Sequence, residues 1–164
     1  QTSQETHPFD HLLMSYHGLP IRQLPCVEQN EYVCKGGATS CPGVDSDFPN
    51  CYRSHCYATS RALASQLNLS DTEYSVSFQS RLGNIPWIQP YTSEHIHTLV
   101  ENGVKHLAVI CPAFVSDCLE TLEEINMEIR EEFLDAGGEK FTYIPCINDN
   151  ADWVKPLITS HLQT

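Results

Sequence analysis

Apolar runs and amphipathic segments alternate along the chain. Short runs rich in β-branched and aromatic residues predict strands at 12–16, 74–78, 106–111 and 141–144. Longer segments with apolar positions every three or four residues predict helices at 52–67, 93–102, 116–136 and 151–162. Because parallel strands need crossover connections, this strict strand–helix alternation predicts an α/β fold with a four-stranded parallel sheet, covered by helices on both faces.

The stretch 21–51 interrupts this alternation. It contains four cysteines, three glycines and three prolines and has little periodicity. A loop of this length is uncommon in a compact domain unless it is functional or cross-linked. We therefore expect a distinct, cross-linked or ligand-binding insertion here.

Composition and charge restrict the class of protein. The 164 residues suit one domain, and 41% hydrophobic residues are enough for a core. A net charge of −12, from 21 acidic and 9 basic residues, argues against nucleic acid or an anionic membrane surface as the main partner. Residues 1–10 do not show the basic and apolar regions expected of a signal peptide, and no run approaches the ~18 apolar residues of a membrane span. A chain with its own core does not need a disulfide framework, so the eight cysteines favour a cytoplasmic setting with ligand-type thiols.

A histidine ends the first predicted strand. In open parallel sheets ligands gather beyond the carboxyl ends of the strands, which is where His17 and Gln79 would lie. A lone histidine is more often structural, but Gly18 follows it directly, so the imidazole can face a cleft. There it would accept protons near neutral pH or bind a metal of borderline softness.

The segment 116–133 combines an apolar stripe with an acidic one. The positions of the apolar stripe are Leu119, Leu122, Ile125 or Asn126, Ile129 and Phe133. The acidic positions are Asp117, Glu120, Glu124, Glu128 and Glu131. The plainer interpretation is a solvated acidic face. The alternative is that the first turn brings Glu120 and Glu124 into the cleft of His17, where clustered carboxylates would bind a divalent cation.

Two further segments carry candidate chemistry. The loop 80–92 contains Arg81 and Trp87, which would anchor and stack on a flat, acidic ligand, although such loops more often cover a core edge. The cysteines Cys26, Cys34, Cys41 and Cys51 match the ligand count of an iron–sulfur cluster or a structural zinc. Their spacing fits no standard pattern for either, and two disulfides remain the alternative.

Five motifs together resemble a known family. They are SYHGLP at 15–20, FQSRLGNIPWIQPYT at 78–92, CPAFVSDCLETLEEI at 111–125, AGGEKFTYIPC at 136–146 and IND at 147–149. In this order they closely resemble the carboxyl-terminal half of bacterial ferrochelatase, of the type with an internal cysteine-rich insertion. The resemblance implies a three-layer αβα chelatase-like fold over 1–164 as a single domain, with the insertion at about 21–51.

The resemblance also implies a reaction and its residues. Ferrochelatase inserts Fe²⁺ into protoporphyrin IX with release of two protons, in the terminal step of haem biosynthesis. His17 and Glu120 match the catalytic pair, and Glu124 joins them as a ligand of the iron substrate. The porphyrin-binding residues would be Tyr16, Gln79, Ser80 and Trp87.

The insertion matches a cofactor site of the same family. Some bacterial ferrochelatases hold a [2Fe-2S] cluster in a cysteine-rich insertion soon after the active histidine. The resemblance therefore assigns Cys26, Cys34, Cys41 and Cys51 as its ligands. Cys118 departs from relatives that have histidine there, which weakens any metal-relay role for this position.

Only one of the family's two similar halves is present. We expect a truncated half, because Gln1 begins within a motif, although two copies that together complete a cleft are the alternative. The expected partners are porphyrin, ferrous iron and the missing amino-terminal half, in the cytoplasm or in peripheral contact with the inner membrane. The rival functions are a chelatase for another metal or tetrapyrrole, and a non-catalytic iron–sulfur or haem-binding module.

Overall fold

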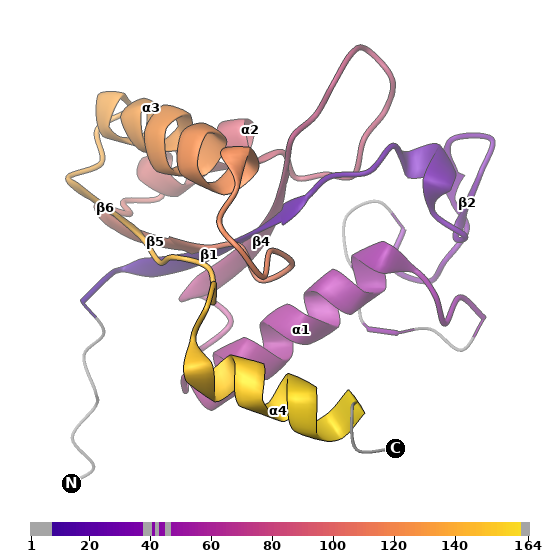
Figure 1. Cartoon of the computed structure of the whole chain (residues 1–164). Helices are drawn as coiled ribbons and strands as arrows, with labels where there is room; N and C mark the ends of the chain where they lie inside the picture. Colours follow the sequence, from indigo (N-terminus) through magenta and orange to yellow (C-terminus); the bar gives the residue numbers. More distant parts are fainter. Residues whose placement is uncertain (1–7, 38–40, 42, 45–46, 162–164) are drawn as a thin grey trace, which may run out of the picture.

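The computed structural model describes residues 8–37, 41, 43–44 and 47–161, and its centre is a four-stranded parallel sheet (Figure 1). Its strands are β1 (His11–His17), β4 (Tyr74–Gln79), β5 (His106–Ile110) and β6 (Lys140–Tyr143). Their spatial order is β4-β1-β5-β6, so the first strand in sequence lies inside the sheet. The predicted strands are confirmed, each to within one residue at either end.

Helices cover both faces of this sheet. They are α1 (Tyr52–Gln66), α2 (Thr92–Glu101), the π-helix η2 (Glu120–Ile129), its continuation α3 (Arg130–Asp135), and α4 (Ala151–His161). In Figure 1, α2 and α3 lie on one face, and α1 and α4 lie on the other. The predicted α/β fold with a four-stranded parallel sheet is confirmed. Within the described residues, no helix is both long and apolar enough to cross a membrane.

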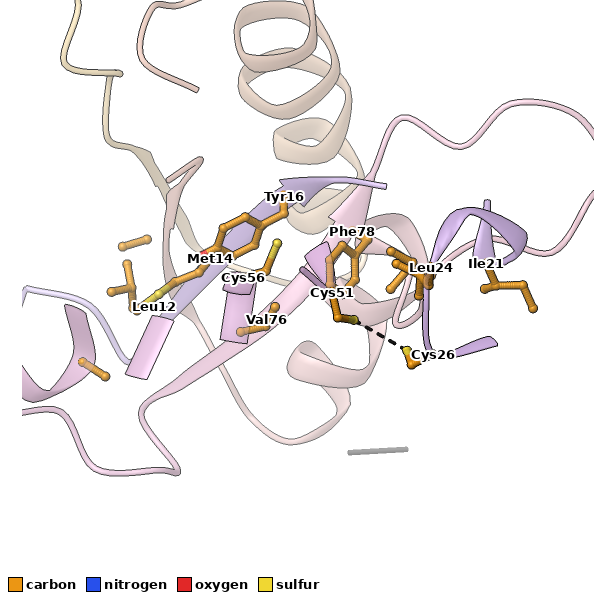
Figure 2. Packing of buried hydrophobic residues seen from close by; sticks show 13 residues of the cluster. Leu12, Met14, Tyr16, Ile21, Leu24, Cys26, Cys51, Cys56, Val76 and Phe78 are labelled. Carbon is orange, nitrogen blue, oxygen red and sulfur yellow. Dashed lines mark hydrogen bonds between the residues drawn. The ribbon is translucent and has the colours of Figure 1, made fainter. Parts of the chain in front are cut away.

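Strand alternation divides the core into two layers. On β1, Leu12, Met14 and Tyr16 face the α1 side, where Figure 2 shows them with residues of β4 and α1. Leu13 lies in the other cluster, together with apolar residues of α2, η2 and α3. Because successive side chains of a strand point to opposite faces, His17 belongs to the α2–α3 side of the sheet.

The acidic helix is wound differently from the prediction. It begins at Glu120, and its first ten residues form a π-helix, which has i→i+5 hydrogen bonds and wider turns. Its buried residues recur at every fourth position, at Thr121, Ile125 and Ile129. Leu119 and Leu122 are 71% and 47% exposed, so their place in the predicted apolar stripe was wrong. In the wider turns of a π-helix, residues four positions apart share a face. Thr121 therefore lies on the buried face with Ile125, and Leu122 does not.

The insertion contains short elements that the sequence did not reveal. Residues Ile21–Gln23 form a 3₁₀ turn, η1, and an antiparallel hairpin follows with strands β2 (Val27–Glu28) and β3 (Glu31–Tyr32). The hairpin loop is Gln29-Asn30, with φ of 49° and 67°. Positive φ at both central residues is the type I′ geometry that fits two-residue hairpins. The asparagine was the only local signal, and the strands are too short to show periodicity.

Candidate active site

The site lies at the carboxyl ends of β1 and β4, where His17 and Gln79 are register partners. The half-buried imidazole of His17 has Nδ1 2.6 Å from the carbonyl oxygen of Gly18. A carbonyl only accepts hydrogen bonds, so Nδ1 carries the proton. In this tautomer the lone pair is at Nε2, where it can take a proton or bind a metal.

A glycine after the histidine lets three segments meet. The N–H of Gly18 donates to the carbonyl of Gln79 at 2.8 Å. A Cβ at Gly18 would lie 2.8 Å from the same oxygen and 3.3 Å from Cε3 of Trp87. Any side chain here would therefore push the histidine strand away from β4 and from the aromatic loop.

Buried hydrogen bonds orient the amide of Gln79. Its Oε1 accepts from Ser15 Oγ at 2.8 Å, and Ser15 in turn bonds Thr92 at 3.0 Å. With the oxygen so engaged, Nε2 donates to the carbonyl oxygen of Glu120 at 2.7 Å and to Oε2 of Glu124 at 3.2 Å. The side chain thus connects the end of β4 to the first turn of η2.

Ser80 holds the carboxylate of Glu124 with two donors. Its backbone N–H and its hydroxyl lie 2.6 Å from Oε1 and Oε2 respectively. Ser80 has φ of 64°, a left-handed conformation that costs a non-glycine residue about 1–2 kcal/mol. The two hydrogen bonds to the side chain of Glu124 offset this strain and fix its position.

Glu120 lies within electrostatic range of His17. Its pKa is lowered chiefly by a hydrogen bond from the thiol of Cys118, then by its own backbone N–H and by the charge of the His17 ring when protonated. At neutral pH the side chain is a carboxylate on the same side of the sheet as the imidazole. The structure thus places a group of site residues at the carboxyl ends of β1 and β4, namely His17, Gln79, Ser80, Glu120 and Glu124.

Acidic side chains continue from this edge along the helix. A cavity of about 220 Å³ is lined by Ser80, Glu124, Glu128 and Glu132 among others. Repulsion, above all from Glu123, raises the pKa of Glu128. A divalent cation entering here would relieve this repulsion, whereas an anion would increase it.

The aromatic loop lies beside the histidine strand. Trp87 and Pro20 form an isolated β-bridge, and the indole N–H donates to the carbonyl of Leu82 at 3.0 Å. Arg81, expected to anchor acidic groups of a ligand, instead has its guanidinium 4.2 Å from the ring centroid of Tyr91. Trp87 is therefore close to the site, while Arg81 already has a partner within the loop.

Tyr16 does not fit its predicted role as a porphyrin contact. It is 2% exposed, and its hydroxyl bonds Ser60 Oγ at 2.8 Å within the α1 side of the core. The physical reason is the alternation of β1, which sends neighbouring side chains to opposite faces of the sheet. The resemblance placed Tyr16 near the end of β1, where it lies, but its side chain points into the α1 side of the core.

Asp117 is a residue whose role the sequence reasoning missed. Its carboxylate accepts hydrogen bonds from the Tyr143 hydroxyl, from the Asn148 amide at 2.8 Å and from the Cys146 backbone N–H at 3.2 Å. Burial opposes ionisation, but these bonds outweigh it and hold the pKa of Asp117 well below its usual range. The carboxylate thereby fastens the segment after β6 to the start of η2. Only its place before the helix hinted at this.

The four predicted cysteine ligands line one small cavity of about 20 Å³, together with Phe48, Arg53 and others. The sulfurs of Cys26 and Cys51 are 3.5 Å apart (Figure 2). Burial raises the pKa of Cys26 to about 12, and the nearby Cys51 and Cys34 add to the effect. Across the part of the chain that is described, no three Cys, His, Asp or Glu side chains already form a metal-binding group.

The fold and the site around His17 define a class of α/β protein, with a histidine and carboxylates at the carboxyl ends of the parallel strands. The family model for ferrochelatase matches residues 1–163, and the chain belongs to the ferrochelatase family. It is 49% identical over 150 residues to the ferrochelatase of Pseudomonas fluorescens strain Pf-5 and 46% identical over 151 residues to that of Stutzerimonas stutzeri. The matches cover 92% of this chain and 44% of each of those proteins, so the chain spans less than half of their length.

Proposed function

We propose that this chain forms the metal-handling half of a ferrochelatase site, at which Fe²⁺ is inserted into a porphyrin. The observation that carries the proposal is that His17 is the register partner of Gln79, whose amide donates to the carbonyl of Glu120 and to the carboxylate of Glu124. The imidazole offers Nε2 as a base, and the carboxylates offer hard oxygen ligands to a divalent cation. This edge combines the two tasks of the reaction, removal of protons and delivery of metal.

The chemistry follows from the protonation states. A free-base porphyrin loses two pyrrole protons when Fe²⁺ binds its four nitrogens. Nε2 of His17 accepts a proton leaving the ring, and the ionised Glu120 stabilises the resulting imidazolium. Glu124, held by Ser80 and Gln79, leads the cation towards the ring from the acidic cavity. Trp87 borders the space that the macrocycle occupies.

Three finer assignments belong to the same proposal. Protoporphyrin IX is the substrate by resemblance to the family. The porphyrin lies between this chain and a second α/β half, either of the same protein or of a second copy, in keeping with the share of its relatives that this chain spans. The reaction takes place in the cytoplasm or at the inner membrane surface.

A glutamine at position 124 tests the metal-handling role. Glu124→Gln keeps the shape of the side chain but removes the charge, so we expect iron insertion at subsaturating Fe²⁺ to fall about tenfold to a hundredfold. Anaerobic loss of porphyrin fluorescence measures the rate. The matched control is Glu131→Gln, which removes an exposed charge from the same helix outside the acidic cavity. Equal rates in the two variants would contradict the proposed role.

We also propose that Cys26, Cys34, Cys41 and Cys51 hold a [2Fe-2S] cluster. The donor set fits, because all four thiols line one cavity. The Cys26–Cys51 separation of 3.5 Å is near the about 3.8 Å between sulfurs on one tetrahedral metal with bonds of about 2.3 Å. When bound, such a cluster accepts or donates one electron at a time. The start of the insertion is joined to the Trp87 loop, through the Pro20–Trp87 bridge and the bond from Ile21 N–H to the Pro86 carbonyl.

Iron and sulfide analysis tests the cluster. We expect the protein, purified without oxygen, to be brown and to contain about two irons and two acid-labile sulfides per chain. Cys34→Ser should lose both, because a hydroxyl is a poor ligand for iron. Cys56→Ser is the control, since Cys56 is buried in α1 and does not line the cavity. A colourless protein that contains zinc would contradict the cluster and indicate a structural zinc site instead.

A further inference from the structure

Arg53 places a permanent positive charge against the cysteine cavity. It is the second residue of α1, is 1% exposed, and lines the same cavity as Cys26, Cys34, Cys41 and Cys51. A guanidinium stays protonated even when it is buried, so its charge cannot be removed by titration. Taking such a charge out of water costs several kcal/mol unless other groups compensate. The burial of this charge beside four thiols therefore requires compensating interactions.

Several groups hold the guanidinium where it is. Nη1 donates to the carbonyl oxygen of Gly37 at 2.7 Å. The guanidinium carbon lies 4.9 Å from the ring centroid of Tyr32 and 5.6 Å from that of Tyr57. These contacts join α1 to the hairpin and to the chain between two of the cysteines. The charge is thus fixed in place and does not sample solvent.

The charge acts on the thiols. Arg53 and the four cysteines line one cavity, so the buried charge faces their sulfurs. Four thiolates around two ferric ions and two sulfides make a doubly negative group, and one added electron makes it triply negative. A fixed cation stabilises both states but favours the more negative one, and the low local dielectric strengthens the effect.

We infer that Arg53 is the buried cation that compensates the charge of the group held by the four cysteines and raises its reduction potential. The inference rests on the cluster proposed above and adds the residue that governs its electron affinity. The simpler alternative is that Arg53 only clamps the insertion to α1. A clamp would affect the stability of the insertion and leave the potential unchanged, so the two roles are distinguishable.

A redox titration of the purified protein with dithionite and mediator dyes, followed by visible absorbance, tests the inference. We expect Arg53→Gln to move the one-electron equilibrium at least tenfold towards the oxidised form, which lowers the potential by about 59 mV or more. Arg53→Lys keeps the charge and should stay within about threefold of the wild type. Arg61→Gln is the matched control. Arg61 lies on the same helix and bonds the Cys41 carbonyl at 3.0 Å, but it does not line the cavity.

Each outcome decides the question. Equal potentials in Arg53→Gln and Arg61→Gln would overturn the inference and leave the cluster intact. A wild-type protein without iron and sulfide would overturn the cluster and the inference together. If a folded Arg53→Gln protein loses its cluster while Arg53→Lys and Arg61→Gln retain it, charge compensation is supported, because lysine keeps the charge without the planar guanidinium that a clamp needs.

A second pair of variants covers the case in which Arg53→Gln does not fold. Tyr32→Leu removes the ring that holds the guanidinium, and Tyr32→Phe keeps that ring. We expect the leucine variant to shift the redox equilibrium about threefold in the same direction, and the phenylalanine variant to match the wild type. Equal potentials in the two variants would count against the inference.

Discussion

His17→Ala is expected to reduce iron insertion about a thousandfold. The substitution removes the base whose Nε2 lone pair is set by the Nδ1 bond to Gly18, and general acid–base catalysis contributes typically about 10²–10⁴-fold. It also removes the positive charge that a protonated ring would present to Glu120. Anaerobic porphyrin fluorescence in the complete protein measures the rate, and circular dichroism checks that the fold is retained.

The control is a histidine at the opposite, amino-terminal end of the parallel strands. His106 begins β5, and its side chain lies 3.9 Å from Glu139, far along the strand direction from the proposed site. His106→Ala should keep at least half of the wild-type rate. Free imidazole in the assay should restore part of the activity of His17→Ala but not alter His106→Ala. If His17→Ala keeps more than a tenth of the rate, the proposed proton acceptor is wrong. A non-catalytic iron–sulfur or haem-binding module would have no iron insertion to lose.

The parallel sheet was predictable because its signals are local. Each central strand is a short apolar run, and each helix has apolar positions every three or four residues, so the strand–helix order followed directly. The hairpin 27–32 gave no such signal, because its two-residue strands are fixed by their surroundings. Local patterns reveal elements that are long enough to bury a face of their own.

The location of the candidate site in the fold was predictable from the sequence, but the arrangement of its side chains was not. The rule that ligands gather at the carboxyl ends of parallel strands located His17 and Gln79 correctly. The predicted apolar stripe assumed α-helical spacing, whereas the buried residues of the π-helix η2 lie four positions apart, and Leu119 and Leu122 are exposed. The left-handed backbone of Ser80 is likewise a tertiary effect, since serine has no local preference for it.

Gly138→Ala is expected to lower the free energy of unfolding by about 3 kcal/mol or more, the largest stability effect of the predicted substitutions. A Cβ at Gly138 would overlap the ring of Phe133, which is fully buried and 6.0 Å from the ring of Phe141. The ring cannot retreat, because core packing is dense and α3 and β6 hold its neighbours. Urea denaturation measures the loss.

The matched control is another glycine that lacks the clash. Gly103 has φ of 90°, and a Cβ there meets nothing within 4 Å. Gly103→Ala therefore carries only backbone strain and should cost about 1 kcal/mol. A smaller side chain at position 133 should relieve the clash. The double variant Gly138→Ala with Phe133→Leu should therefore lose less stability than the sum of the two single changes. Equal losses for the two glycine variants, or strict additivity in the double variant, would mean that contact with Phe133 does not explain why position 138 requires glycine.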